Sequence, residues 1–319
     1  MKTMNKIEKP LTSDRLKQHQ LLAIITLIII TFASCNQAGL KEQKAIDTIH
    51  VMVSILPQKY FVEQIAGNKA VVSVLIPPGS NPHVYDPTPR QMEEISRTEI
   101  YFMIGYLGFE QVLKSSLIDN YPNLKMYNQS SGVNLMGHEG EACEHAEHQP
   151  DESGIDPHTW LSPKNVLVMA KTTLDNLIEN SPENAQAFTE NYEQFIRKIN
   201  LLDYKIDSIL ENLPSRKFMI FHPSLAYFAK DYNLIQIPIE FEGKEPAPAR
   251  LKDAVAAAKS SGIHVIFIQK EFDAENAKII ANEIQGKVAQ IDPLSADWEE
   301  NLIQIAQSIK DSFYDTNQN

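Results

Sequence analysis

The stretch from Ser181 to Pro214 reads SPENAQAFTENYEQFIRKINLLDYKIDSILENLP. Its apolar residues recur at intervals that alternate between four and three: Phe188, Tyr192, Phe195, Ile199, Leu202, Ile206, Ile209 and Leu213. Such spacing keeps a single apolar stripe along an α-helix. Ser181 suits the N-cap, Pro182 suits the first turn, and Pro214 blocks continuation of the helix. We therefore expect one helix within residues 181–213, in which roughly 30 helical residues make a rod of about 45 Å.

A helix this long in the middle of a chain is either an arm of a coiled coil or a rigid connector between two lobes. No neighbouring segment carries a matching heptad repeat, so we favour the connector. Residues 48–180 would then form an N-terminal lobe, and residues 214–319 would form a C-terminal lobe.

Short strand patterns alternate with helical patterns on both sides of this helix. The strand patterns are Ile49–Leu56, Ala70–Pro77, Ile100–Gly105 and Leu124–Tyr127 before it, and Lys217–His222, Leu234–Ile239, Ile263–Gln269 and Lys287–Asp292 after it. Alternation of this kind predicts a parallel sheet with helices on both faces. We therefore expect an α/β protein of two lobes, each with a four-stranded parallel sheet flanked by helices, joined by one long rigid helix.

The charge of the chain narrows its possible partners. It has 319 residues, of which 41 are acidic and 29 are Lys or Arg, which gives a net charge of −12. This balance argues against nucleic acid as a partner, because phosphate binding requires a basic surface. It is compatible with a protein that handles cations.

The N-terminus has the pattern of a signal peptide. Basic residues precede an apolar run over residues 21–33, which is shorter than the ~20 residues that span a bilayer. The run ends in FASC at Cys35, and small residues directly before a Cys resemble a bacterial lipobox. We expect residues 1–35 to contain a lipoprotein signal peptide cleaved before Cys35, followed by a polar tether over residues 36–47. A plain secretory signal or an uncleaved anchor is the alternative.

Four potential metal ligands stand in loops on the two sides of the long helix: His83 and His158 before it, His222 and Asp292 after it. In open α/β sheets, ligands bind beyond the carboxyl ends of the strands. His83 follows the second strand pattern, and His222 and Asp292 end later ones. All four can therefore reach the same edge, in a cleft between the lobes.

The types of these residues favour zinc. Three imidazoles and one carboxylate suit the tetrahedral coordination of zinc, whereas manganese and calcium prefer more oxygen ligands. A thiolate site is excluded, because Cys143 is the only free thiol expected after lipidation. Each His also fits a solvent-facing loop residue, and Asp292 before Pro293 also fits the start of a turn. Spacing alone therefore predicts a metal site between the lobes and nothing more specific.

The sequences around these ligands resemble the metal-binding loops of bacterial ABC-transporter solute-binding proteins of the zinc/manganese family. The matching segments are PGSNPHVYDPTP (78–89), DPHTWLSP (156–163), FHPSLAYF (221–228) and IDPL (291–294), and the resemblance extends from Ile49 to Phe313. It implies a zinc-uptake lipoprotein that binds Zn²⁺ between two lobes through His83, His158, His222 and Asp292. Within that family, His at the third position is typical of zinc members, whereas manganese members usually carry Glu there. Zn²⁺ is therefore the expected ligand, ahead of Mn²⁺.

The resemblance also implies partners and location. The chain would be an extracytoplasmic protein held to the bacterial membrane by its lipid anchor, a monomer and not an enzyme. It would deliver Zn²⁺ to the permease and ATPase of an ABC importer. The alternatives are a manganese- or iron-binding homologue, a zinc-dependent hydrolase and a cell adhesion protein. A hydrolase is disfavoured because four protein ligands leave no open position for water, and no HExxH motif is present.

The loop over residues 137–151 is a second candidate for metal binding. It carries His138, His145 and His148 among four Glu residues, together with Cys143. Clustered His in a charged, Gly-containing segment is typical of an auxiliary metal-binding tract. We expect weak binding there, because nothing in the segment can fix the ligand geometry. A solvated acidic loop with incidental His is the alternative.

Overall fold

The computed structural model describes residues 48–137, 154–240 and 246–314. The expected signal peptide, the tether and Cys35 lie outside these residues, as do the loop residues His138, His145, His148 and Cys143. They stay predictions. Within the described ranges, no helix combines the length and the apolarity that are needed to cross a membrane.

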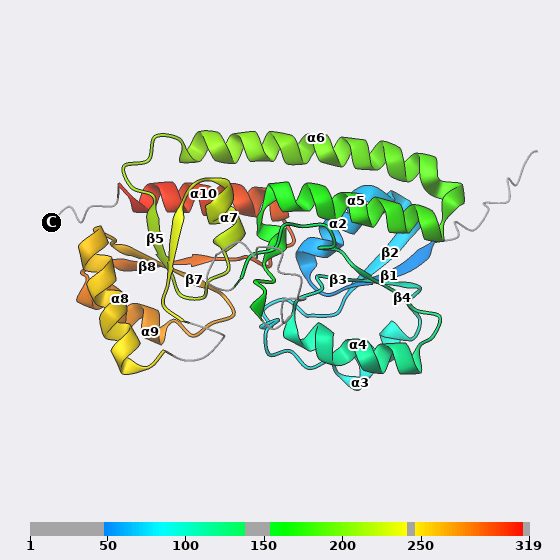
Figure 1. The fold of residues 1–319 in the computed structure, drawn as a ribbon, viewed down its shortest axis with the longest axis horizontal. Coiled ribbons are helices and arrows are strands. Elements are labelled where there is room, and N and C mark those ends of the chain that lie inside the picture. Colours follow the sequence, from blue (N-terminus) through cyan, green and yellow to red (C-terminus); the bar gives the residue numbers. More distant parts are fainter. Residues whose placement is uncertain (1–47, 138–153, 241–245, 315–319) are drawn as a thin grey trace, which may run out of the picture. The chain divides into compact units, whose positions relative to one another are not determined.

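Two four-stranded parallel sheets form the framework of the described chain (Figure 1). The first contains β1 (Ile49–Val53), β2 (Ala70–Val74), β3 (Ile100–Met103) and β4 (Lys125–Asn128), and the second contains β5 (Lys217–Ile220), β6 (Ile235–Pro238), β7 (Val265–Gln269) and β8 (Lys287–Ile291). The strand orders are β2-β1-β3-β4 and β6-β5-β7-β8, so the two sheets share one topology. The predicted α/β fold with one parallel sheet in each lobe is confirmed.

This topology places a switch point in each sheet. In the first sheet the chain passes from β1 to β2 and then crosses over to β3 on the other side of β1, and the second sheet repeats this around β5. The loops beyond the carboxyl ends of the strands diverge at such a switch point and leave a crevice. His222 stands two residues beyond the end of β5, at the switch point of the second sheet.

Helices cover both faces of each sheet, as Figure 1 shows. In the first lobe they are α2 (Leu56–Ala66), α3 (Pro89–Ile95), α4 (Gly108–Asn120) and α5 (Pro163–Asn180), and in the second α7 (Ala226–Asp231), α8 (Pro248–Ser261), α9 (Glu275–Glu283) and α10 (Trp298–Ser312). Short 3₁₀ turns lie at η2 (Gly67–Lys69), η4 (Thr159–Leu161) and η5 (Pro182–Asn184). Because both faces are covered, the central strands β3 and β7 are buried along their whole length and are almost entirely apolar, with Gln269 at the end of β7 as the exception.

The long helix α6 spans Ala185–Leu210 and therefore begins and ends inside the predicted limits. Its expected N-cap, Ser181, instead closes α5, because the Ser181 N–H donates to the carbonyl oxygen of Leu177. A single 3₁₀ turn, η5, fills the gap before α6. At the other end, Asn212 adopts a positive φ of 55°, which stops the helix ahead of Pro214. The 26 residues make a rod of about 39 Å.

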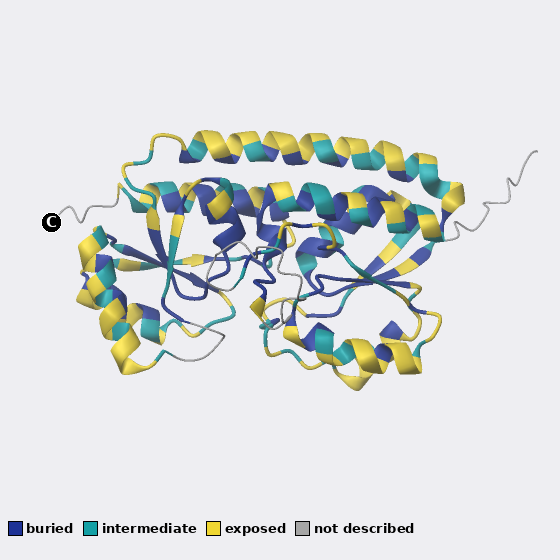
Figure 2. Cartoon of the chain, viewed as in Figure 1, coloured by how far each residue is buried: buried dark blue, intermediate teal, exposed yellow. Residues whose placement is uncertain are grey.

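The apolar stripe of α6 packs along helices of both lobes. Its buried residues are Phe188, Phe195, Ile199, Leu202, Ile206 and Leu210. They face α2 and α5 of the first lobe and α10 of the second, while the opposite side of α6 is exposed (Figure 2). One hydrophobic cluster runs from β1 through α6 into α10. The long helix is therefore a connector between lobes and not a free arm.

An aromatic junction ties the lobes together a second time. Trp298, at the start of α10, packs edge-on against Phe61 of α2 with ring centroids 5.0 Å apart. The Trp298 indole N–H donates to the Trp160 carbonyl oxygen at 2.8 Å, and the Trp160 indole N–H donates to the Pro293 carbonyl oxygen at 2.9 Å. Both indoles are almost completely buried. Movement of one lobe against the other would have to break this junction.

Glu110 is a buried carboxylate that braces the first lobe. Its oxygens accept hydrogen bonds from the Ser54 hydroxyl and from the backbone N–H groups of Ile104 at 2.9 Å and Gly105 at 2.7 Å. Burial raises the pKa of Glu110 from 4.5 to about 7, against the lowering effect of these hydrogen bonds. The folded protein therefore binds this proton more tightly than the unfolded chain does.

The raised pKa of Glu110 predicts a pH-dependent stability. Its contribution is fully present below about pH 4.5 and is lost as the pH rises through about 7, a loss of about 3 kcal/mol at most. Glu110→Gln should remove this loss, because the amide does not ionise. Urea unfolding of both proteins at pH 5 and pH 8 measures it. An equal pH dependence in the variant and the wild type would contradict the assignment.

Candidate metal centre

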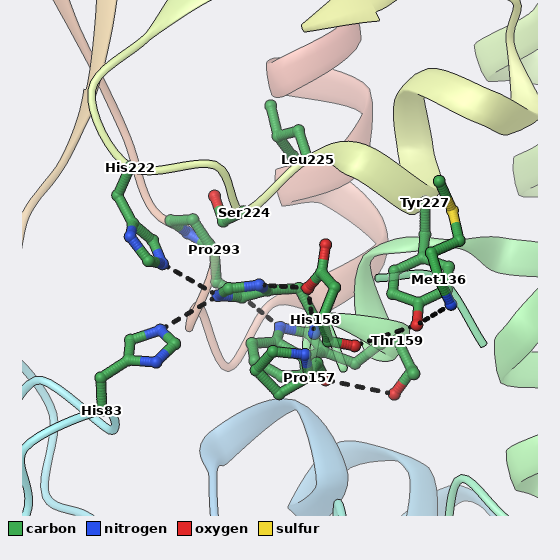
Figure 3. Close-up of polar contacts among 12 residues, drawn as sticks. His83, Met136, Pro157, His158, Thr159, His222, Ser224, Leu225, Tyr227 and Pro293 are labelled. Carbon is green, nitrogen blue, oxygen red and sulfur yellow. Dashed lines mark hydrogen bonds and ion pairs between the residues drawn. The ribbon is translucent and has the colours of Figure 1, made fainter. Parts of the chain in front are cut away.

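Three His side chains from both lobes meet at one point between the sheets. Figure 3 shows His83 and His222 pointing towards His158. The His158 Nε2 atom lies 3.2 Å from the Nε2 atom of His83 and 3.3 Å from that of His222. Two ligands at the zinc–nitrogen distance of about 2.0–2.1 Å in a tetrahedron are about 3.3 Å apart. Both separations from His158 Nε2 therefore match two ligands of one zinc ion, and one ring nitrogen from each of the three residues lies within 4.8 Å of the other two.

His83 is positioned by the loop between β2 and α3. The Asn81 side-chain oxygen accepts a hydrogen bond from the His83 backbone N–H at 2.9 Å, which forms a tight local turn. Two residues on, the Tyr85 hydroxyl bonds the Gln91 side chain and its ring packs edge-on against Phe109. The several Pro residues of this loop restrict its backbone further. His83 is the half-buried member of the triad.

His158 is held by a carboxylate from its own loop. Asp156 Oδ1 accepts hydrogen bonds from the backbone N–H of His158 at 2.9 Å and lies 2.6 Å from its Nδ1 atom. The residue directly precedes η4 and α5, and its side chain is buried. These contacts fix the ring with Nε2 directed at the other two imidazoles.

His222 is held from three sides within the second lobe. Its Nδ1 atom lies 2.7 Å from Glu240 Oε2, and its carbonyl oxygen accepts a hydrogen bond from Gln269 Nε2 at 2.7 Å. The ring of Phe272 stacks on the imidazole, with centroids 4.9 Å apart and planes 21° apart. Both His222 and Glu240 are buried.

The two buried carboxylates determine what the triad can bind. A carboxylate on Nδ1 accepts the Nδ1 proton and so leaves a lone pair on Nε2. The Nε2 atoms of His158 and His222 then face each other at 3.3 Å as two acceptors, which repel each other unless a cation lies between them. The arrangement is therefore suited to a cation.

A largely apolar pocket surrounds the triad, with residues from both lobes. It is lined by Asn81, Pro82, Trp160, Ser224, Gln269, Glu271, Phe272, Pro293 and Leu294. Apolar walls lower the local dielectric and strengthen the attraction between a cation and its ligands. Glu271 is the one carboxylate in this lining, and burial raises its pKa, with a smaller contribution from the charge of Asp292.

Asp292, the fourth predicted ligand, stands apart from the triad. Its carboxylate forms an ion pair with Lys270, with Oδ2 and Nζ 2.6 Å apart. Among the described residues, the His, Cys, Asp and Glu side chains that can share one metal are His83, His158 and His222 alone. The structure therefore brings three of the four predicted ligands together, and the role of Asp292 stays a prediction.

Tyr227 links the ligand loops across the two lobes. Its hydroxyl accepts a hydrogen bond from the Met136 N–H at 3.0 Å and donates one to the carbonyl oxygen of Asp156 at 2.9 Å (Figure 3). Tyr227 follows His222 by five residues, and Asp156 holds His158. A single side chain thus fixes the loop of one ligand relative to the loop of another.

Sequence reasoning missed several of these supporting residues. Asp156 stands in the quoted DPH motif, two residues before His158, so its role had a local signal. Glu240 and Gln269 lie 18 and 47 residues from His222 along the chain. Nothing in the sequence near His222 indicates either contact, because the pairing of distant strands creates both.

Comparison with known proteins identifies the family. The family model of ZnuA, zinc-uptake complex component A, periplasmic, matches residues 51–313. The high-affinity zinc uptake system protein ZnuA of Bacillus subtilis strain 168 is 27% identical over 282 residues, which cover 86% of this chain and 88% of that protein. The zinc-binding lipoprotein AdcA of Streptococcus pneumoniae serotype 4 is 25% identical over 284 residues, 87% of this chain and 56% of that protein.

A solved structure agrees with this match. A crystal structure of ZnuA superimposes with a TM-score of 0.77 at 38% identity, covering 83% of this chain and 99% of that one. The family match extends from β1 to the end of α10 and so includes all three members of the His triad. The chain therefore belongs to the zinc-uptake complex component A family of periplasmic proteins.

Proposed function

We propose that this chain captures Zn²⁺ outside the cytoplasm, in the pocket between its lobes, and delivers it to the permease and ATPase of an ABC importer. The observation that carries the proposal is the convergence of three imidazoles, in which His158 Nε2 lies at zinc-like distances of 3.2 and 3.3 Å from the Nε2 atoms of His83 and His222. Membership of the zinc-uptake family supports the same function.

The donor set favours zinc over manganese. Imidazole nitrogen is a preferred ligand of zinc, whereas manganese prefers carboxylate, carbonyl and water oxygens. In the triad all three donors are nitrogens, and the nearby carboxylates of Asp156 and Glu240 are engaged with imidazoles. A hard, oxygen-seeking ion therefore gains less from this site than zinc does.

The mechanism of capture follows from the connection between the lobes. The shared core along α6 and the Trp160–Trp298 junction resist a wide opening of the lobes. We therefore expect loading to rearrange loops around the ligands instead of closing a hinge. Of the three ligand loops, that of His83 carries the half-buried ligand.

We propose Asp292 as the fourth ligand, which must leave Lys270 to reach the metal. In that case Lys270→Met should raise the zinc affinity several-fold, because the carboxylate no longer has a competing cation. Asp292→Asn should lower the zinc affinity. Competition against a chromogenic chelator measures both variants. If the two substitutions leave the affinity unchanged, zinc is held by the triad without Asp292.

Two further assignments rest on the sequence. We propose Cys35 as the lipidated first residue of the mature protein, and the mass of the membrane-extracted protein checks this.

We also propose a second, weaker zinc site at His138, His145 and His148. Deletion of residues 137–151 should remove a weak event in calorimetry and keep the tight one, since the three ligands of the triad lie outside this segment.

Metal analysis tests the proposed function. The protein is purified without added metal, its metal content is measured, and Zn²⁺ and Mn²⁺ are then titrated in competition. We expect one tightly bound Zn²⁺ that equimolar Mn²⁺ does not displace. Displacement by equimolar Mn²⁺ would instead identify the chain as a manganese-binding homologue.

A further inference from the structure

Glu240 is a buried carboxylate bonded to the ring nitrogen of His222 that faces away from the triad. Its Oε2 atom lies 2.7 Å from His222 Nδ1, and the residue is 1% exposed. It follows β6, which pairs in parallel with β5, the strand that leads to His222. No feature of the sequence singled this residue out.

Backbone hydrogen bonds fix the position of Glu240 relative to His222. Beyond the ends of β5 and β6, the pairing continues through the Ile239 N–H, which donates to the Ile220 carbonyl oxygen at 3.0 Å, and the Glu240 N–H, which donates to the Phe221 carbonyl oxygen at 2.9 Å. Glu240 is thereby held beside the residue that precedes His222. Its approach to the imidazole is a consequence of strand register and not of a flexible side chain.

The contacts of Glu240 differ from those of Glu110, the buried carboxylate of the first lobe. Both oxygens of Glu110 accept backbone N–H groups, from Ile104 and Gly105. Of the two Glu240 oxygens, Oε2 contacts only the imidazole, and Oε1 is buried with no hydrogen-bond partner among the described residues. A buried, half-satisfied carboxylate costs stability. Its contact with an imidazole of the triad therefore points to a role in that site.

We infer that Glu240 is a positioning residue for zinc, an inference that rests on the proposed function. It fixes His222 with Nε2 directed at the metal, and its buried negative charge offsets the charge that Zn²⁺ brings into the apolar pocket. Asp156 stands in the same relation to His158, so one anion lies behind each of the two buried ligands. The two carboxylates together place two negative charges behind imidazoles that are themselves neutral as metal ligands.

Two substitutions separate this role from a structural one. Glu240→Gln keeps an oxygen that can accept the Nδ1 proton but removes the charge, and Glu240→Met removes both at similar volume. Removal of such an outer partner typically lowers metal affinity 10–100-fold. We expect a loss of roughly 10-fold for Gln and roughly 100-fold for Met. The melting temperature of the metal-free protein should be unchanged or raised in the Gln variant, because burial of a neutral amide costs less free energy than burial of a charged carboxylate.

Glu110→Gln is the matched control, because it neutralises an equally buried carboxylate away from the triad. Zinc affinity is measured by chelator competition, and the melting temperature is measured without metal, for the wild type and all three variants. The control should keep the zinc affinity of the wild type within twofold. Wild-type affinity in both Glu240 variants, or an equal loss of affinity in the control, would overturn the inference. A wild-type protein without zinc affinity would overturn the proposed function instead.

Discussion

Replacing His158 by Ala should abolish tight zinc binding and leave the fold intact. His158 is the central member of the triad, since its Nε2 atom lies within 3.3 Å of the Nε2 atoms of both His83 and His222. Its loss removes one of the three nitrogen ligands and leaves the tetrahedral site incomplete. We expect the affinity to fall by more than the roughly 100-fold typical for an outer partner.

His50→Ala is the control for this experiment. His50 is an exposed residue of β1 and takes no part in the triad. Isothermal titration with Zn²⁺ should give wild-type binding for His50→Ala and no tight event for His158→Ala, while both proteins keep the far-ultraviolet circular dichroism of the wild type. Tight zinc binding by His158→Ala would show that the metal lies elsewhere.

Replacing Trp298 by Ala should cost about 3–5 kcal/mol of unfolding free energy, the range for removal of a buried large aromatic side chain. The indole is 1% exposed, packs on Phe61, and donates a hydrogen bond to the Trp160 carbonyl oxygen. Because the junction joins the lobes, its loss should also weaken the cooperativity of unfolding. We expect a single urea transition for the wild type and a broader or divided one for the variant.

Tyr204→Ala provides the comparison. Tyr204 lies on the solvent side of α6 and is 72% exposed, so its removal should change stability by no more than about 0.5 kcal/mol. Urea unfolding followed by circular dichroism measures both variants. A Trp298→Ala protein that loses less than about 1 kcal/mol would contradict the role of the aromatic junction.

Local patterns were sufficient to predict the elements of the fold. The stripe of α6 repeats over seven turns, and the strands β3 and β7 are apolar runs of the right length. Each of these patterns lies within one segment of chain and does not depend on contacts with distant residues. The start of α6 was predicted too early, because Ser181 suits a cap by its type but its N–H already bonds the preceding helix. Ser181 could cap the start of α6 or the end of α5, and the residue type alone does not say which of the two helices it caps.

The residues of the candidate site also fall into those that the sequence predicts and those that it does not. His83, His158, His222 and Asp292 were predicted to reach one edge because loops at the carboxyl ends of parallel strands converge, a rule that applies to the whole fold. Their assignment as ligands came from the resemblance of their loops to those of the metal-binding family, and the structure brings the three His residues together. Glu240 and Tyr227 were missed, because their contacts depend on strand register and on the packing of one lobe against the other. The pairing of Asp292 with Lys270 joins residues 22 positions apart and was equally invisible in the sequence.

X-ray absorption at the zinc edge tests the central claim most directly. The protein loaded with one equivalent of Zn²⁺ should show a four-coordinate metal whose shell is dominated by imidazole nitrogen at about 2.0–2.1 Å. The signal of one imidazole should disappear in His222→Ala. A shell with sulfur at about 2.3 Å, or a six-coordinate shell of oxygen alone, would contradict the three-histidine site.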